Sequence, residues 1–574
     1  MNEPIDLKRR RLVQLTGLSA AAATFPQLLL AATATRPSHR ASFDFHPDVD
    51  LELTARPASL PILSGPMTNV WKFYGKLLKG PKGSVEAIPG SFLGPILRLK
   101  KGQKVRIRFH NELPAESVVH WHGLHVPAEM DGHPMYAIKQ GETFVYEFEI
   151  LNRAGPYWYH PHPHWVTARQ VYSGLAGLVL VTDEEEEALN LPSGNYDVPI
   201  VLQDRTFDDR NQLSYSDHMM TRMRGFLGDQ ILINGQAGFT LPVATRSYRL
   251  RLLNGSNSRI YKLGWDDGTA LTVIGNDGGL LEKPVTRPYI MLAPGERVDL
   301  WMNFKGRPVG SELVMRSLPF TVSMHGMMGG GMMDGGGRGG MGGGMMGGGR
   351  RGGMMGGGGR GGMGGGMMGG GERSGMGGGQ QGMMGGGMMS GSAIPLGSEY
   401  PVLKVRVVRE ESDDSALPQR LSSITRYRLQ DAVNSEQPKI ITLSMRHMSA
   451  LLNGRSYKMN DVAPDEIMAL NSLQLIEFDN GFEGGHGMMM PHPMHIHGLQ
   501  FQIVKRSINP GSEKAYRSVS EGFVDEGWKD VALVMPGEKV TLLKRFDDFK
   551  GSFMYHCHNL EHEDLGMMRD FLVR

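Results

Sequence analysis

Cysteine is almost absent from this sequence, which has only Cys557 among 574 residues. One cysteine cannot form an internal disulfide, so in an oxidising compartment its thiol must be buried, modified or bound to a metal. A thiol that simply packs in a core is the usual outcome for a lone cysteine, and it is the structural alternative to a metal ligand.

An excess of charge of one sign is also lacking. Lys and Arg number 61 and Asp and Glu number 59, so the formal net charge is +2. The sequence has no basic stripe with interleaved aromatic residues, and we therefore expect no nucleic-acid partner.

Long hydrophobic runs are missing as well. The apolar stretch after Arg9 and Arg10 is interrupted by Thr, Ser and Pro and ends in small residues near Ala32 and Ala34. It is too short and weak for a spanning helix, although a membrane anchor is the alternative interpretation. Residues 1–34 resemble a twin-arginine export signal, which predicts a protein exported in folded form to the periplasm, without a membrane span.

The apolar runs that are present indicate an all-β chain of three β-sandwich domains. The length suggests three or four domains, and short apolar runs alternate with Gly, Pro and Asn turns. The predicted domains are residues 41–185, 186–410 and 418–574. Because the middle domain has no histidine clusters, we expect it to act as a spacer while the two ends of the chain come together.

Residues 324–391 interrupt the middle domain with a different composition, since 38 of these 68 residues are Gly and 18 are Met. Such a segment cannot form a packed core. A flexible chain in which Met is merely interspersed is one interpretation. Thioethers are soft ligands that suit Cu(I), and we favour the interpretation that this insertion binds extra copper.

Histidine is concentrated in short motifs. With 20 His in the chain, composition alone predicts on the order of one pair spaced i, i+2. The sequence has five such pairs, which are His120/His122, His160/His162, His162/His164, His495/His497 and His556/His558. Residues two apart on a strand share one face. A structural zinc site needs only four ligands, so a multinuclear copper site is the better match.

The segment HCHNLEHEDLGMM at residues 556–568 combines thiol, imidazole and thioether groups. On a strand, Cys557 would point away from His556 and His558, so that one strand end could serve two metal sites. A thiolate, two imidazoles and a long axial thioether form the ligand set of a blue-copper site. Cys557, His562 and Met567 would supply three of these four ligands.

Four motifs carry a family resemblance: HWHG at 120–123, HPHPH at 160–164, HPMHIHG at 492–498, and the segment at 556–568. In this order they resemble the copper-ligand motifs of the three-domain multicopper oxidases, which implies three cupredoxin-like Greek-key β-sandwich domains. The resemblance covers the chain after the export signal, except for the Gly/Met-rich insertion. The local sequence, including GLAGLVLV after the second motif, is most similar to the exported bacterial copper-efflux cuprous oxidases, followed by the laccases.

This resemblance implies four copper ions per chain and assigns their ligands. The type 1 ligands would be His492, Cys557, His562 and Met567. The type 2 ligands would be His120 and His495, and the type 3 ligands would be His122, His160, His162, His497, His556 and His558. His164 has no ligand counterpart in the family, and we expect it to support the fold or a neighbouring ligand.

The resemblance also implies a mechanism. Single electrons would enter at the type 1 site, pass from Cys557 to His556 and His558, and reduce O₂ to two waters. Asp131 and Glu563 are the candidate proton relays, and orientation of ligand histidines is a compatible alternative role. An axial methionine suggests a lower potential than Leu or Phe would give, which favours easily oxidised donors such as Cu(I) and electron-rich phenols.

The donor site departs from the cuprous-oxidase pattern. Met445, Met488 and Met490 are the candidate substrate ligands. Alignment places Met445 and Met490 on methionine positions of that family, whereas Ala450 and Met488 occupy the positions of its aspartates. Thioethers alone could bind Cu(I), and core packing is the alternative role of these methionines.

The insertion also departs from the pattern, because the cuprous oxidases carry their Met-rich segment in the third domain. A 68-residue flexible tether has ample reach in principle. The favoured prediction is a monomeric oxidase of Cu(I) and phenols that serves copper tolerance. A general laccase and a periplasmic copper-sequestering protein are the alternatives; two-domain nitrite reductases lack the type 3 histidines.

Overall fold

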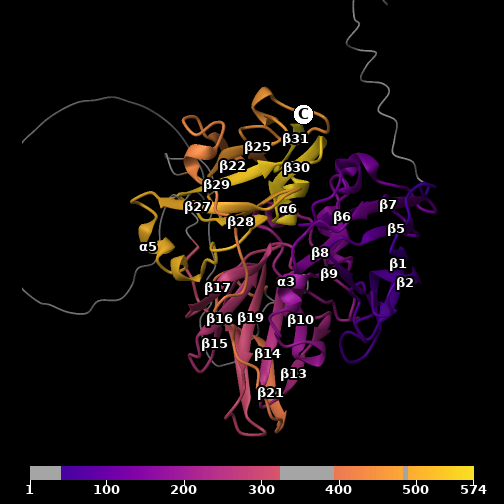
Figure 1. Cartoon of the computed structure of the whole chain (residues 1–574), viewed down its shortest axis with the longest axis vertical. Coiled ribbons are helices and arrows are strands. Elements are labelled where there is room, and N and C mark those ends of the chain that lie inside the picture. The colour runs from indigo at the N-terminus through magenta and orange to yellow at the C-terminus, as the bar shows by residue number, and fades with distance from the viewer. Residues whose placement is uncertain (1–39, 323–392, 447, 482–488) are drawn as a thin grey trace, which may run out of the picture. The chain divides into compact units, whose positions relative to one another are not determined.

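Six β-sheets provide most of the regular structure in the computed structural model, which describes residues 40–322, 393–446, 448–481 and 489–574 (Figure 1). The predicted export signal, the Gly/Met-rich insertion and Met488 lie outside these described residues. The sheets form three successive pairs along the chain.

The first pair is built from strands with alternating apolar residues. Its strands are β1 (Val49–Leu60), β2 (Thr68–Lys79), β3 (Val85–Glu86), β4 (Ile96–Lys100), β5 (Lys104–Asn111), β6 (Val119–His122), β7 (Thr143–Glu149), β8 (Gly155–Pro161) and β9 (Gly177–Thr182). They form the sheets β2-β1-β5-β7 and β3-β4-β9-β8-β6. Val105, Ile107 and Phe109 alternate along β5, and all three side chains are buried in the core of this pair.

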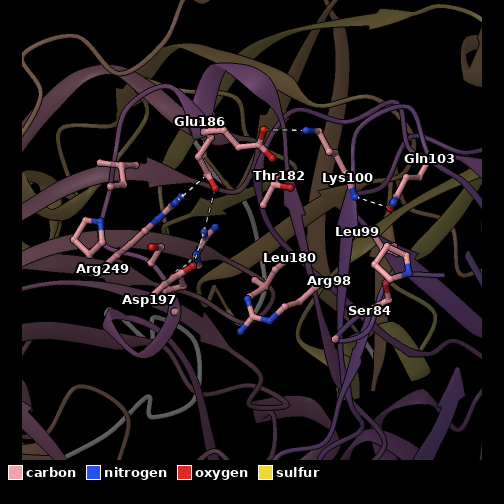
Figure 2. A pocket seen from close by; sticks show the side chains of 18 of the residues that line it. Ser84, Arg98, Leu99, Lys100, Gln103, Leu180, Thr182, Glu186, Asp197 and Arg249 are labelled. Atoms are coloured by element: carbon pink, nitrogen blue, oxygen red, sulfur yellow. Dashed lines mark hydrogen bonds and ion pairs between the residues drawn. The ribbon is translucent and has the colours of Figure 1, made fainter. Parts of the chain in front are cut away.

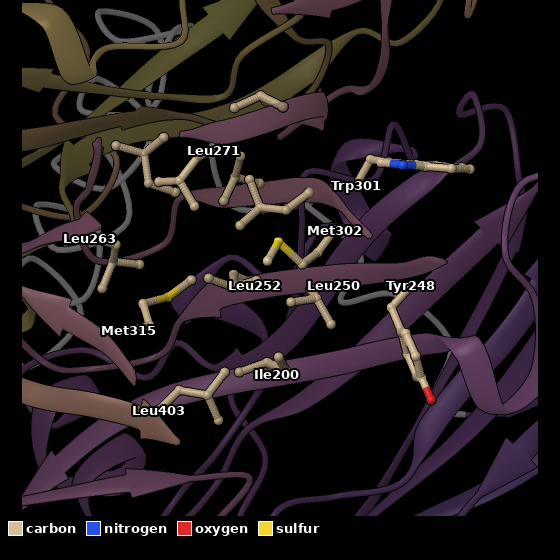
Figure 3. Close-up of a cluster of buried hydrophobic side chains, with 14 of the residues drawn as sticks. Ile200, Tyr248, Leu250, Leu252, Leu263, Leu271, Trp301, Met302, Met315 and Leu403 are labelled. Carbon is tan, nitrogen blue, oxygen red and sulfur yellow. The ribbon is translucent and has the colours of Figure 1, made fainter. Parts of the chain in front are cut away.

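The second pair has a larger sheet. Its strands are β10 (Asp197–Arg205), β11 (Gln230–Ile233), β12 (Gln236–Ala237), β13 (Thr240–Ala244), β14 (Ser247–Asn254), β15 (Tyr261–Trp265), β16 (Leu271–Asn276), β17 (Gly279–Arg287), β18 (Ile290–Leu292), β19 (Arg297–Asn303), β20 (Glu312–Ser317) and β21 (Tyr400–Arg409). They form the sheets β12-β11-β10-β14-β19-β16-β17 and β13-β21-β20-β15-β18. Figure 3 shows Leu250 and Leu252 of β14 in one apolar cluster with Met315 and Leu403 of the other sheet.

The third pair contains the C-terminal motifs. Its strands are β22 (Lys439–Arg446), β23 (Ser449–Leu452), β24 (Ile467–Met468), β25 (Ser472–Asp479), β26 (His492–Ile496), β27 (Phe501–Ile508), β28 (Val531–Val534), β29 (Glu538–Phe546), β30 (Gly551–Cys557) and β31 (Met568–Val573). They form the sheets β23-β22-β25-β29-β27 and β24-β31-β30-β26-β28.

The three pairs repeat one topology. The pairs β1–β5, β10–β14 and β22–β25 are all parallel, and so are β4–β9, β13–β21 and β24–β31. In this repeat β6 and β8 correspond to β26 and β30, and in the middle pair to β15 and β20. The predicted all-β fold is confirmed, whereas the exact domain boundaries stay a prediction.

Short helices connect the strands. They are α2 (Thr167–Tyr172), α3 (Glu184–Glu187), α4 (Met219–Arg224), α5 (Glu513–Tyr516) and α6 (Leu560–Asp564), with 3-10 turns η1 (Ala128–Met130), η2 (Pro134–Tyr136), η3 (Gly194–Tyr196), η4 (Leu429–Asp431), η5 (Pro464–Glu466) and η6 (Ser520–Gly522). Across the described ranges, no helix is both long and apolar enough to cross a membrane.

Candidate metal centres

The predicted type 1 residues meet at the ends of two neighbouring strands. His492 is the first residue of β26, Cys557 is the last residue of β30, and His562 lies in α6. The Cys557 Sγ atom lies 3.5 Å from His492 Nδ1 and 3.7 Å from His562 Nδ1. Met567 is fully buried in the same apolar cluster as Cys557, and its carbonyl accepts a hydrogen bond from the Cys557 N–H (3.0 Å). The structure therefore brings together a thiol and two imidazoles, with a thioether residue packed nearby.

The local sequence around α6 explains the orientation of the His562 ring. Asn559 is the N-cap of α6, and its side chain accepts a hydrogen bond from the His562 N–H (3.3 Å). After the helix, Gly566 has a φ of 101°, which lets the chain reverse into β31. The His562 Nε2–H donates to the backbone carbonyl of Met223 (3.2 Å) and leaves Nδ1 directed at the thiol.

Each of the three acidic residues of α6 contacts a different part of the protein. Glu561 accepts hydrogen bonds from residues of the second sheet pair, namely Tyr215, Phe226, Asn257 and Ser258. Glu563 Oε2 lies 3.0 Å from His556 Nδ1, and Asp564 accepts from the backbone N–H groups of Thr167 and Ala168 (3.0 Å each). Of these three residues only Glu563 is predicted from the sequence, because the partners of Glu561 and Asp564 lie hundreds of residues away.

Eight predicted ligand histidines gather at the ends of β6, β8, β26 and β30. Strand register brings them together: His120 pairs with His160 across β6 and β8, and His495 pairs with His556 across β26 and β30. All eight are at most 1% exposed. The corresponding strands of the middle pair, β20 and β15, carry no histidine, so equivalent positions in the first and last repeats build the cluster.

His120 and His495, the predicted type 2 residues, face each other. Their Nε2 atoms are 3.4 Å apart. The Nδ1–H of His120 donates to the carbonyl of Asp131 (2.6 Å), and that of His495 donates to the carbonyl of Asp530 (2.8 Å). Each ring thus has one nitrogen fixed by a backbone acceptor and the other directed at its partner, as ligand histidines require.

The six predicted type 3 histidines separate into two groups of three. In the first group, His556 Nε2 lies 3.3 Å from His162 Nε2 and 3.2 Å from His497 Nε2. The Nδ1–H of His497 donates to Asp131 Oδ2 (2.6 Å). Asp131 therefore links a predicted type 2 residue to this first group.

The second group contains His122, His160 and His558, whose ring centroids lie 4.9–5.6 Å apart. His160 Nδ1 donates to the Pro161 carbonyl (2.9 Å), and His122 Nε2 lies 3.2 Å from Asp530 Oδ1. His122 Nδ1, His160 Nε2 and both nitrogens of His558 have no hydrogen-bond partner among the described residues. Unpaired polar atoms are costly to bury, so these nitrogens fit metal ligands.

Burial also sets the protonation state of the ligand residues. It lowers the pKa of His160 to about 3 and the pKa values of His162 and His562 to about 4. The pKa values of His120 and His495 also fall well below the usual range for the same reason. Neutral imidazole is the form that binds metal, so these rings need not lose a proton at neutral pH.

The acidic neighbours differ from one another. Burial raises the pKa of Asp131 well above its usual range, although Lys544 opposes this. Burial would also raise the pKa of Glu563, but His162 and His556 outweigh it and hold that pKa well below the usual range. Of the two predicted proton relays, Asp131 is thus the more readily protonated.

Asp530 is a further acidic residue at the cluster that the sequence does not predict. Its carboxylate receives two hydrogen bonds from Arg297 (2.5 and 2.7 Å), a residue of β19 in the middle pair. Asp530 also contacts His122 and His495, as described above. The middle pair supplies no predicted ligand, but through Arg297 it also supports the cluster, a role that the spacer prediction did not include. No local pattern marks Asp530, because both of its roles depend on tertiary contacts.

The predicted substrate methionines are buried. Met445 of β22 pairs with Ala450 of β23, and these residues are 3% and 0% exposed. Met490 is 4% exposed, and its carbonyl accepts from Asn480 (2.8 Å). A role in substrate binding stays a prediction for Met445 and Met490. The ring of His164 stacks on Trp165 and contacts Tyr457 at its edge, which agrees with a structural role.

A separate cavity of about 620 Å³ contains none of the predicted ligands (Figure 2). Ion pairs cross its wall: Glu186 pairs with Arg249 (2.8 Å) and Arg251 (3.3 Å), and Asp197 pairs with Arg251 (2.7 Å). These buried arginines lie on β14 next to the core residues of Figure 3. We interpret this region as a structural junction.

Comparisons with known proteins agree with this geometry. Residues 71–186 and residues 432–574 each match a family model described as multicopper oxidase. Multicopper oxidase mco of Staphylococcus haemolyticus is 29% identical over 486 residues, which cover 84% of this chain and 83% of that protein. The laccase of Bacillus subtilis is 25% identical over 529 residues, which cover 84% and 88%.

A solved structure extends the similarity over almost the whole chain. The 2F4 variant of McoA multicopper oxidase from the hyperthermophile Aquifex aeolicus is 30% identical, covers 92% of this chain and 97% of its own, and has a TM-score of 0.68. This alignment also confirms the cupredoxin-like sandwich fold. Since both regions that carry the histidine motifs match one family and a solved member aligns with nearly all of the chain, this protein belongs to the multicopper oxidase family.

Proposed function

We propose that this protein is an oxidase that takes single electrons from Cu(I), and also from phenols, and passes them to O₂. When bound, one copper at His492, Cys557, His562 and Met567, one at His120 and His495, and two at the remaining six histidines would supply the one-electron chemistry. The orphaned ring nitrogens and the buried thiol support this assignment.

The position of Cys557 is the observation that carries the proposal. Its Sγ atom faces His492 and His562, while its covalent neighbours His556 and His558 belong to different groups of three histidines. An electron that arrives at the thiolate therefore has a short covalent route to each group. A protein that only stores copper has no need of such a connection.

Side chains around the cluster would handle the protons that O₂ reduction consumes. Asp131 contacts His120 through its carbonyl and His497 through its carboxylate, so it is placed to move protons near both. Glu563 lies between His162 and His556, at 3.6 and 3.0 Å, where it would orient both rings and relay protons.

We further propose export to the periplasm by way of residues 1–34 and a role in copper tolerance. Met445, Met488 and Met490 are the substrate ligands proposed from the family resemblance, although Met445 and Met490 are buried, and the insertion remains a proposed copper-binding segment. A general laccase is the second candidate, supported by the similarity to the Bacillus laccase.

Oxygen uptake by the copper-loaded protein tests these alternatives, with Cu(I) and then a phenol as donor. The intact chain is compared with one that lacks residues 326–390. If the insertion delivers Cu(I), its deletion raises the KM for Cu(I) and leaves phenol turnover unchanged. If neither donor is affected, a general laccase becomes the better description.

A further inference from the structure

Four consecutive residues before and at the start of α4 expose metal-binding side chains. They are Asp217, His218, Met219 and Met220, which carry a carboxylate, an imidazole and two thioethers. Met219 is 38% exposed and Met220 is 44% exposed. Thioethers are preferred ligands of Cu(I), so these two exposed methionines can meet an arriving cuprous ion.

The segment that carries these residues contacts the type 1 site directly. The Met223 carbonyl accepts the hydrogen bond from His562 Nε2 (3.2 Å), and Arg222 donates to the Asp564 carbonyl (3.3 Å). The side chain of Met223 is buried in the same apolar cluster as Cys557. Helix α4 is thus the part of the middle sheet pair that lies against a predicted type 1 ligand.

Helical geometry connects the exposed thioethers to this contact. Met219 and Met223 are spaced i, i+4 and share one face of the helix. Their separation along the helix axis is about 6 Å, from a rise of roughly 1.5 Å per residue. An ion held by Met219 would therefore lie about one helical turn from the residue that is hydrogen-bonded to His562.

Glu561 holds both ends of this segment. Its Oε1 accepts from the Tyr215 hydroxyl (2.9 Å), and its Oε2 accepts from the Phe226 N–H (3.0 Å). Residues 215–226 thereby form a loop that is closed on the helix of His562, and the Ser216 and Thr221 hydroxyls bond within it (3.2 Å). These hydrogen bonds hold the segment that carries the exposed methionines against α6.

The other candidate methionines are buried, which favours α4 as the site that Cu(I) reaches. Met445 and Met490 are 3% and 4% exposed, so an arriving ion would have to displace packed atoms to reach them. Met219 and Met220 are accessible without any rearrangement.

We propose that Met219 and Met220, with His218 and Asp217, form the docking site at which Cu(I) is oxidised. Each Cu(I) would give one electron, by way of His562, to the copper that this residue helps to hold, and would become Cu(II). Four such electrons, with one O₂ and four protons, yield two waters. The thioethers favour the incoming Cu(I), and the imidazole and carboxylate favour the Cu(II) product. This inference depends on the proposed oxidase function.

The test replaces both thioethers in the full-length, copper-loaded protein as Met219→Leu/Met220→Leu and measures oxygen uptake. We expect the KM for Cu(I) to rise about tenfold, which corresponds to roughly 1.4 kcal/mol of binding, while kcat/KM for a phenol stays within about twofold. Ag(I), which this oxidase cannot oxidise further, should inhibit Cu(I) oxidation, and the inhibition constant should rise by a similar factor.

Two matched variants show whether location matters. Met67→Leu removes a 48% exposed methionine of the first sheet pair, and we expect no change. Met448→Leu removes a 61% exposed methionine beside β22, close in sequence to Met445. If Met448→Leu raises the KM and the double variant does not, the docking site is on the third sheet pair and the inference is overturned.

The remaining outcomes separate this inference from the proposed function. If the unsubstituted protein oxidises phenols but not Cu(I), the cuprous part of the proposed function fails. If it oxidises Cu(I) and the double variant has the same KM, only the docking site is refuted. An equal loss with both donors would also refute the site, because it would indicate general damage to electron entry.

Discussion

Glu561 offers the sharpest test of how the middle sheet pair supports the type 1 site. Its carboxylate is 1% exposed and accepts from Tyr215 (2.9 Å) and Asn257 (2.8 Å) at Oε1, and from the Phe226 N–H (3.0 Å) and Ser258 at Oε2. The substitution Glu561→Gln keeps the shape but turns one acceptor into a donor.

The loss can be estimated from these contacts. The hydroxyls of Tyr215 and Ser258 can rotate and accept from the new amide, but the N–H groups of Phe226 and Asn257 cannot. In either amide orientation one buried N–H group loses its acceptor, which costs about 1–3 kcal/mol. We therefore expect Glu561→Gln to destabilise the packing of α6 by about 2 kcal/mol, and Glu561→Ala by more.

The assay follows the type 1 site, because a multidomain protein need not unfold in one step. Visible absorption of the copper-loaded protein is recorded against denaturant concentration. We expect the blue band of Glu561→Gln to disappear at lower denaturant than in the unsubstituted protein. Glu513→Gln, at an exposed position of α5, serves as the control and should change stability by less than about 0.5 kcal/mol. An unchanged midpoint for Glu561→Gln would refute the reasoning.

Three further predictions concern the site itself. Cys557→Ser should abolish the blue absorption band and donor oxidation while circular dichroism stays native, and a retained band would contradict the type 1 assignment. In Asp131→Asn the side chain can still accept a hydrogen bond from His497 but cannot relay a proton. We therefore expect kcat to fall at least about tenfold while the blue band stays intact. Glu129→Gln, at an exposed position nearby, is the control and should leave kcat unchanged. The metal-free protein should lose stability as the pH falls below about 6.5. In the folded protein the pKa values of His160 and His562 are lowered to about 3 and about 4. Between these values and pH 6.5 the unfolded chain therefore binds more protons than the folded chain. Between pH 6.5 and 5 the loss is about 2 kcal/mol per histidine, so identical denaturation midpoints at pH 7 and 5 would contradict it.

Local patterns in the sequence predict much of this architecture. Pairs of histidines at i, i+2 identify strand faces, and the offsets from Cys557 to His562 and Met567 indicate a blue-copper ligand set. The structure adds the register, which places His120 opposite His160 and His495 opposite His556.

Support from the middle sheet pair was not predictable in the same way. Arg297 contacts Asp530 across 233 residues, and Met223 contacts His562 across 339. A lone Arg or a backbone carbonyl has no periodicity that distinguishes it from others of its type. Contacts of this kind depend on the tertiary structure and cannot be predicted from local sequence patterns.

The repeated topology has a consequence for biosynthesis. His120 and His495 face each other although 375 residues separate them, so a ribosome must add all of the intervening chain before the first motif meets its partner. A nascent chain that ends before β26 carries imidazoles whose partners have not yet been translated. Metal insertion in the final geometry therefore has to follow completion of the C-terminal repeat, and a truncated translation product cannot assemble the centre.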